Sequence, residues 1–124
     1  MKKYYMSIIL FILATAPFDA TPAEFINPYD FNETEANKKA VIEYIKERVH
    51  HDYCDRIDMC DALTLRSMED ENLKAFKDLT KAQNKQILNR VIRDYCGRVD
   101  MCDYITINNM YQENLSASKD ELTW

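Results

Sequence analysis

The stretch DYCDRIDMCDALT at residues 52–64 returns as DYCGRVDMCDYIT at residues 94–106. When residues 45–78 are laid over residues 87–120 without a gap, 19 of 34 positions are identical, where chance would give about two. The chain therefore contains a tandem duplication with a period of 42 residues. A period of about 40 residues is the size of a helix pair in helical repeat proteins.

The first helix of each copy is indicated by apolar residues that recur at helical spacing. These residues are Val41, Ile42, Ile45, Val49 and Tyr53 in the first copy and Ile87, Val91 and Tyr95 in the second. The pattern predicts helices over about 33–54 and 81–96. The predicted capping pairs at their starts are Asn32 with Glu35 and Thr80 with Gln83.

Each first helix is expected to end at its first cysteine and to be followed by a tight corner. Gly97, the only glycine of the chain, stands where a helix end often needs a left-handed residue, and Asp55 is its counterpart. Asp58 and Asp100 can then cap a second helix. The residues three positions later, Asp61 and Asp103, fall near the positive end of that helix.

The second helices are predicted over about 59–77 and 101–117. Their apolar residues scatter around the helical wheel, and residues 104–107 have the β-branched character of a strand. A helix is favoured because residues 68–75 and 110–117 contain no breaker and two strands per copy would need a turn. We therefore expect an all-α protein made of two tandem disulfide-stapled helical hairpins that pack as a small four-helix domain.

Residues 1–23 have the layout of a secretory signal peptide. Lys2 and Lys3 give a positive start, residues 6–16 are nearly all apolar, and a stretch with small residues follows. The apolar run is too short to span a bilayer, which needs roughly 20 residues. We expect cleavage after Ala23, with Ala20 as the alternative, and no membrane insertion of the rest. The two-lysine start indicates a bacterial protein that is periplasmic or secreted.

The expected mature chain, residues 24–124, is one helical domain with repeats over about 36–78 and 79–120 and a loose C-terminal tail. Without the leader it has 14 basic and 20 acidic residues, a net charge of −6. Binding to nucleic acid or to anionic membranes needs basic patches, so neither is expected. The oligomeric state stays open.

Four cysteines in an exported chain predict two disulfides. Three pairings of Cys54, Cys60, Cys96 and Cys102 are possible. We favour Cys54–Cys60 and Cys96–Cys102, because a duplicated gene brings a self-contained unit with it. Each bond would then staple one corner.

A metal site is the sharpest chemical hypothesis, because His50, His51, Cys54 and Cys60 include soft ligands. The second copy has Ile92 and Arg93 in place of the histidines, and oxidation removes the thiols. We therefore expect no metal and no cofactor. The chain also lacks a G-x-S-x-G nucleophile motif, a C-x-x-C pair and phosphate-binding glycine loops, so we expect no enzyme.

Two features are candidates for partner binding. Arg56 and Arg98 are expected at exposed corners, either beside helix C-termini or as two matched surface contacts. Phe25, Tyr29 and Phe31 precede the first helix, either as a strap over the helices or as an arm that reaches a partner.

The leading functional hypothesis is a non-enzymatic exported protein-binding module, an inhibitor or an immunity-type neutraliser. Small size, acidity and a stapled frame suit that role, since acidic binders are steered onto basic targets. The alternative is an envelope chaperone for acid stress, which would expose apolar surface when its carboxylates become protonated.

Overall fold

Residues 21–124 are described by the structure, a computed structural model, and they form four α-helices and no strand. The helices are α1 (Glu35–His50), α2 (Ala62–Leu79), α3 (Lys85–Ile92) and α4 (Tyr104–Ala117). The predicted all-α class is thus confirmed, and the strand-like alternative for residues 104–107 is wrong. The predicted signal peptide lies outside the described residues, except for residues 21–23.

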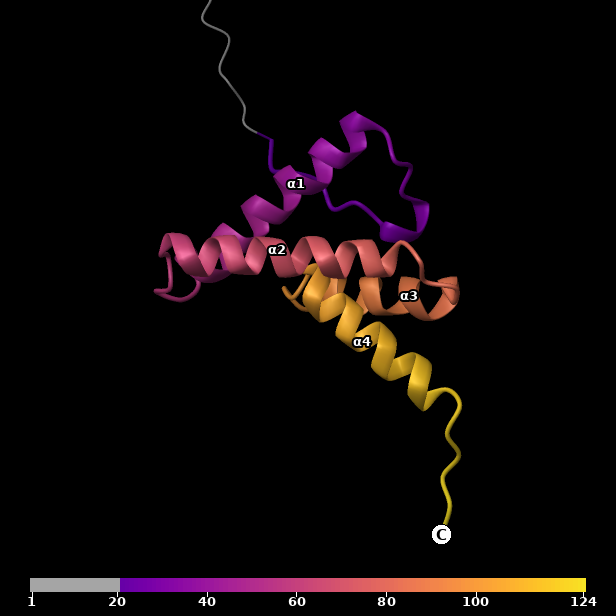
Figure 1. Cartoon of the computed structure of the whole chain (residues 1–124). Coiled ribbons are helices and arrows are strands. Elements are labelled where there is room, and N and C mark those ends of the chain that lie inside the picture. The colour runs from indigo at the N-terminus through magenta and orange to yellow at the C-terminus, as the bar shows by residue number, and fades with distance from the viewer. Residues whose placement is uncertain (1–20) are drawn as a thin grey trace, which may run out of the picture.

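Helix α2 lies in the middle of the molecule (Figure 1). α1 packs on one side of it and α4 on the other, and α3 packs on α4. The two copies therefore meet mainly through α2 and α4. The faces of Ile45 with Val49 and of Ile87 with Val91 contribute to the same core, but the helices that carry them, α1 and α3, are not the main contact between the copies.

The side chain of Tyr104 explains this arrangement. It is 1% exposed and lies among Phe25, Tyr44 and Phe76, with ring centroids 4.9–5.5 Å away. Its hydroxyl donates to the carbonyl of Ile26 over 2.8 Å, so the polar end of the ring has a partner. The first copy has Ala62 at the equivalent position, so only the second copy can insert an aromatic ring between α1 and α2.

The α-helix starts differ from the predicted ones by a few residues. Thr34, and not Asn32, caps α1, accepting from the backbone of Asn37 over 3.1 Å. Asn84 caps α3, accepting from Ile87 over 3.0 Å. Thr80, the predicted cap, instead ends α2, where its hydroxyl donates to the carbonyl of Lys77 over 2.6 Å.

The caps of α2 and α4 are Asp61 and Asp103, three residues after the predicted Asp58 and Asp100. Each accepts a hydrogen bond from a backbone N–H three residues on, at 2.9 Å from Thr64 and 2.8 Å from Thr106. The Thr64 hydroxyl also donates to Asp61 over 2.7 Å. The carboxylates of Asp58 and Asp100 therefore cap no helix and can make other contacts.

The first helix of each copy ends in a π-helical turn, η2 (His51–Asp55) and η3 (Arg93–Arg98). The expected left-handed residue at Gly97 or Asp55 is wrong, because no described residue has a positive φ. The wider turn makes the left-handed residue unnecessary. Backbone bonds then reverse the chain, from Met59 to Tyr53 (2.9 Å) and from Met101 to Tyr95 (3.1 Å).

The C-terminal tail after α4 makes no helix, and Leu122 and Trp124 are fully exposed. Across residues 21–124, no helix combines the length and the apolar character that a membrane crossing needs.

Candidate protein-interaction site

The two disulfides join Cys54 to Cys60 and Cys96 to Cys102, with Cα atoms 4.6 and 4.5 Å apart. Each closes one corner of its own copy, which is the pairing that the duplication favours. Two such bonds indicate an oxidising extracellular compartment. The corners differ in exposure, because Cys60 is exposed whereas Cys102 is 8% exposed.

Cys102 is buried because the second corner docks on the end of α1. Arg48 donates to the carboxylate of Asp100 over 2.6 Å and to its carbonyl over 2.9 Å. Arg56 donates to the same carbonyl over 2.9 Å. The hydroxyl of Tyr44 donates to the carbonyl of Cys102 over 2.6 Å. These bonds join residues far apart in the sequence and fix the second copy against the first.

The charges at this contact support one another. Burial opposes the charge of Arg48, but hydrogen bonds to Asp100 and Asp52 outweigh it and raise the pKa of the guanidinium. Hydrogen bonds from Arg48 and His51 lower the pKa of the Asp100 carboxyl. Burial raises the pKa of Tyr44 to about 12, so its hydroxyl stays a donor.

The lowered pKa of the Asp100 carboxyl predicts that the stability of the protein depends on pH. Asp100 has a folded pKa below the ordinary 3.8, so its contribution to stability is present above that pH and is lost as the pH falls through the folded value. We expect Asp100→Asn to be less stable than wild type at neutral pH and to show a smaller further loss below about pH 4. Urea unfolding between pH 7 and 2 measures both.

The matched control is Asp58→Asn, the same change in the first copy. Asp58 makes no ion pair or side-chain hydrogen bond within residues 21–124, so its variant should follow the wild-type curve. An Asp100→Asn curve that also coincides with the wild-type curve would contradict the role given to Asp100.

The predicted partner-binding residues are not brought together. Arg56 is partly used in the contact between the copies, whereas the side chain of Arg98 is 72% exposed. Phe25 and Phe31 are half-buried and pack edge-on against Tyr44 and Phe76, as a strap does. Tyr29 belongs to the 3-10 turn η1 (Pro28–Asp30), and the centroid of its exposed ring lies 5.0 Å from the ammonium nitrogen of Lys85.

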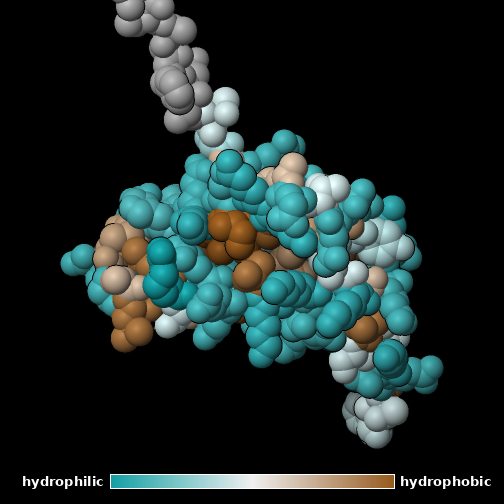
Figure 2. Space-filling view, turned by 45° about the horizontal axis from the view of Figure 1, so that its top comes forward, coloured by the Kyte–Doolittle hydropathy of each residue, from teal (hydrophilic) through white to brown (hydrophobic). Residues whose placement is uncertain are grey.

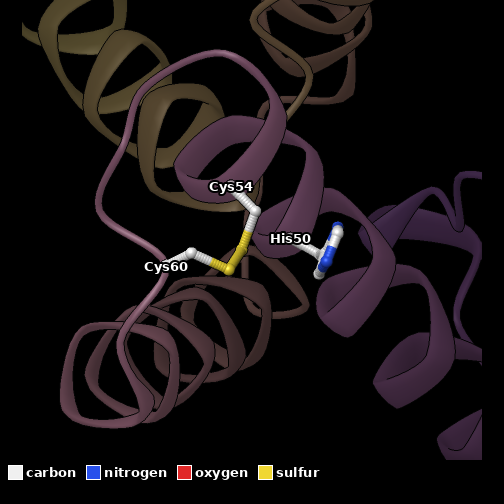
Figure 3. A group of neighbouring side chains, drawn as sticks. All are labelled: His50, Cys54 and Cys60. Atoms are coloured by element: carbon white, nitrogen blue, oxygen red, sulfur yellow. A yellow bond between two sulfur atoms is a disulfide. The ribbon is translucent and has the colours of Figure 1, made fainter.

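His50, Cys54 and Cys60 do converge, with one ligand atom from each within 4.8 Å of the others (Figure 3). The sulfur atoms are bonded to each other, so neither can act as a thiolate ligand. His51 faces Asp100 instead, with Nε2 3.1 Å from the carboxylate.

We therefore keep the prediction that the oxidised protein binds no metal. Elemental analysis of protein purified without a chelator should find less than stoichiometric zinc. One equivalent of zinc that disappears in a His50→Ala, His51→Ala double variant would show the opposite.

An apolar hollow that sequence reasoning missed lies between the strap, α1 and α2. Its volume is about 390 Å³. Figure 2 shows apolar surface in the middle of this face, ringed by hydrophilic residues. The lining residues are Phe31, Val41, Ile42, Leu73 and Phe76, with Glu33, Lys38, Lys77 and Thr80 around them. The sequence signal for it was weak, because Ile42 and Leu73 look like ordinary residues of a helix face.

Comparisons with protein-family models, curated proteins and solved structures found no match for this chain.

Proposed function

We propose that this chain is a non-enzymatic, exported protein-binding module of the bacterial envelope, acting as an inhibitor or an immunity-type neutraliser. The observation that carries the proposal is the apolar hollow, open to solvent and lined by two helices, α1 and α2, whose connection the Cys54–Cys60 disulfide closes. Binding energy at protein interfaces concentrates where a large side chain fills such a pocket and a polar rim excludes water.

The expected occupant is a large apolar side chain of a basic protein. The excess of acidic residues in the chain favours encounter with a basic surface. Within residues 21–124 the ring nitrogens of His50 and His51 pair with the carboxylates of Asp55 and Asp100, and neither histidine makes a hydrogen bond to a hydroxyl or a free thiol. A nucleophile paired with a base would be expected in a hydrolase.

The test begins with a pull-down from the envelope of the native host and continues with the affinity of the partner that it identifies. We expect Ile42→Ser with Leu73→Ser to weaken binding about tenfold or more, since both side chains line the hollow. Leu122→Ser is the control, because that residue is fully exposed in the tail. Equal affinity of both variants would refute the hollow as the binding site.

Export itself has a direct test. The protein recovered from the periplasm should begin at Glu24 or Thr21, and its mass should be short by four hydrogens. A protein that retains Met1 or four free thiols would overturn this localisation.

The acid chaperone is the second candidate, favoured by the contact of Asp100 with Arg48 and His51 between the copies. Protonation would weaken this contact and could separate α4 from α1. A chaperone should bind a dye for apolar surface far more strongly at pH 3 than at pH 7, whereas an inhibitor should stay closed.

A further inference from the structure

The contact between the two copies within the chain uses a small set of polar groups. In the first copy they are Tyr44, Arg48, Arg56 and Asn72, which we call the first receiving set. They bind the second corner, residues 99–104. Four of their bonds are described above, two of them from Arg48, and in the fifth Asn72 accepts from the backbone N–H of Tyr104 over 2.9 Å.

The same positions in the second copy form a second receiving set, Gln86, Arg90, Arg98 and Asn114. All four are exposed. Asn114 is oriented as its counterpart is, because its amide donates to Met110 over 2.8 Å as that of Asn72 donates to Met68 over 2.9 Å. Its oxygen is left as an open acceptor among residues 21–124.

Within residues 21–124, the two arginines of the second receiving set also form no ion pair with a residue of another helix or turn. Arg90 makes no ion pair within the described residues, and Arg98 lies only 3.6 Å from the neighbouring Asp94. One oxygen of Asp94 is buried and accepts no hydrogen bond. In the first copy the equivalent Asp52 accepts from Arg48 over 3.0 Å. The second copy thus has three of the four groups of the first, with Gln86 in place of Tyr44, and no other segment of residues 21–124 docks on them.

The first corner, residues 57–62, is the free counterpart of the docked one. Ile57 and Met59 are 47% and 50% exposed, as Val99 and Met101 of the docked corner also are, at 47% and 44%, so the corners differ in their polar contacts and not in the exposure of these side chains. Asp58 has no side-chain partner in residues 21–124, whereas Asp100 pairs with Arg48 and His51. The N–H of Ala62 begins α2, and the first N–H groups of a helix have no acceptor inside it. Figure 2 shows apolar groups gathered at the left end of the molecule, where Figure 1 places this loop.

We propose that the chain associates head to tail with a second copy of itself, the first corner of one molecule docking on the second receiving set of the next. Asp58 would then pair with Arg90, as Asp100 pairs with Arg48 within the chain. The oxygen of Asn114 would accept from the N–H of Ala62, as Asn72 does from Tyr104. The partner is a second copy because the first corner carries the same D-M-C-D groups that the first receiving set already binds.

The expected association is weak and salt-dependent. The contact within the chain also buries Tyr104 and Phe76, whereas the contact between chains has Ala62 and Ser118 at those positions. Polar pairs at a surface contribute little by themselves and are screened by salt. Because the two surfaces differ, the contact is heterologous and can extend beyond two chains. It does not involve the hollow, so it is independent of the proposed function.

Sedimentation equilibrium of the purified exported protein at low salt tests the proposal. The average mass of wild type should rise with concentration, and added salt should reverse the rise. Asp58→Arg and Arg90→Ala should each stay monomeric, because each lacks one of the two surfaces and the new residues cannot pair with each other. An equimolar mixture of the two variants contains one intact pair of surfaces, so it should form a 1:1 complex and nothing larger.

Asp70→Arg and Lys81→Ala are the matched controls, since both residues are exposed and lie outside the two surfaces. They should associate as wild type does. Any one of three results would overturn the proposal. The wild type could stay monomeric at every concentration, the Asp58→Arg variant could still associate, or the mixture could form no complex. A circular dichroism spectrum of each variant confirms that it is folded.

Discussion

Replacing Tyr104 by alanine should lower the free energy of unfolding by about 3–5 kcal/mol, the range for truncating a large buried ring. This ring is 1% exposed and contacts three other aromatic rings, one from the strap, one from α1 and one from α2. Its removal leaves a cavity where all three meet. Since a domain of this size is stable by only about 5–15 kcal/mol, the variant should be near the limit of folding.

Two variants separate the ring from its hydroxyl. Tyr104→Phe keeps the ring and removes the bond to Ile26, so it should cost only about 1 kcal/mol. Ala62→Gly, at the equivalent position of the first copy, truncates an exposed residue and should cost about 1 kcal/mol or less. Urea unfolding measures all three. A loss for Tyr104→Ala no larger than that for Tyr104→Phe would show that the ring does not hold the copies together.

Replacing Cys96 and Cys102 together by serine should lower the free energy of unfolding by about 2–3 kcal/mol. Opening a closed loop of seven residues costs roughly 2.4 kcal/mol in chain entropy. The effect should be larger than that of the matched pair Cys54→Ser with Cys60→Ser. Cys102 is buried and its carbonyl accepts from Tyr44, whereas Cys60 is exposed.

Non-reducing peptide mapping accompanies this measurement. The Cys54–Cys60 bond should persist in the variant that lacks the second pair. A wild-type fragment that joins Cys54 to Cys96 or Cys102 would contradict the pairing in the structure. A loss below about 1 kcal/mol for both double variants would contradict the role of the staples in stability.

The helical class and the position of the corners could be predicted because both depend on local signals. Helical spacing of Ile45 and Val49, and the absence of breakers in residues 68–75, were enough to indicate helices. The exact starts were missed by up to four residues. Several capping side chains stand close together at each start, and Asp58 and Asp61 are equally good caps by type.

The way in which each first helix ends was also beyond local reasoning. A π-helical turn has no residue signature comparable to a glycine in a left-handed conformation. Gly97 therefore looked like the required residue, although the chain at both corners needs no positive φ.

The duplication, the helices and the two disulfide-closed corners could be predicted from the sequence alone, because these follow from residue spacing within one copy and from identity between the copies. Contacts between copies follow from packing instead. Two nearly identical corners became one docked, with Cys102 buried, and one undocked, with Cys60 exposed. The reason is that residue 104 is a tyrosine that fills the space between α1 and α2, while residue 62 is an alanine that cannot. Three further features depend on that packing: the pairing of Arg48 with Asp100, the lack of a partner for Asp58 in residues 21–124, and the hollow beside Ile42. No pattern along the sequence predicts any of them.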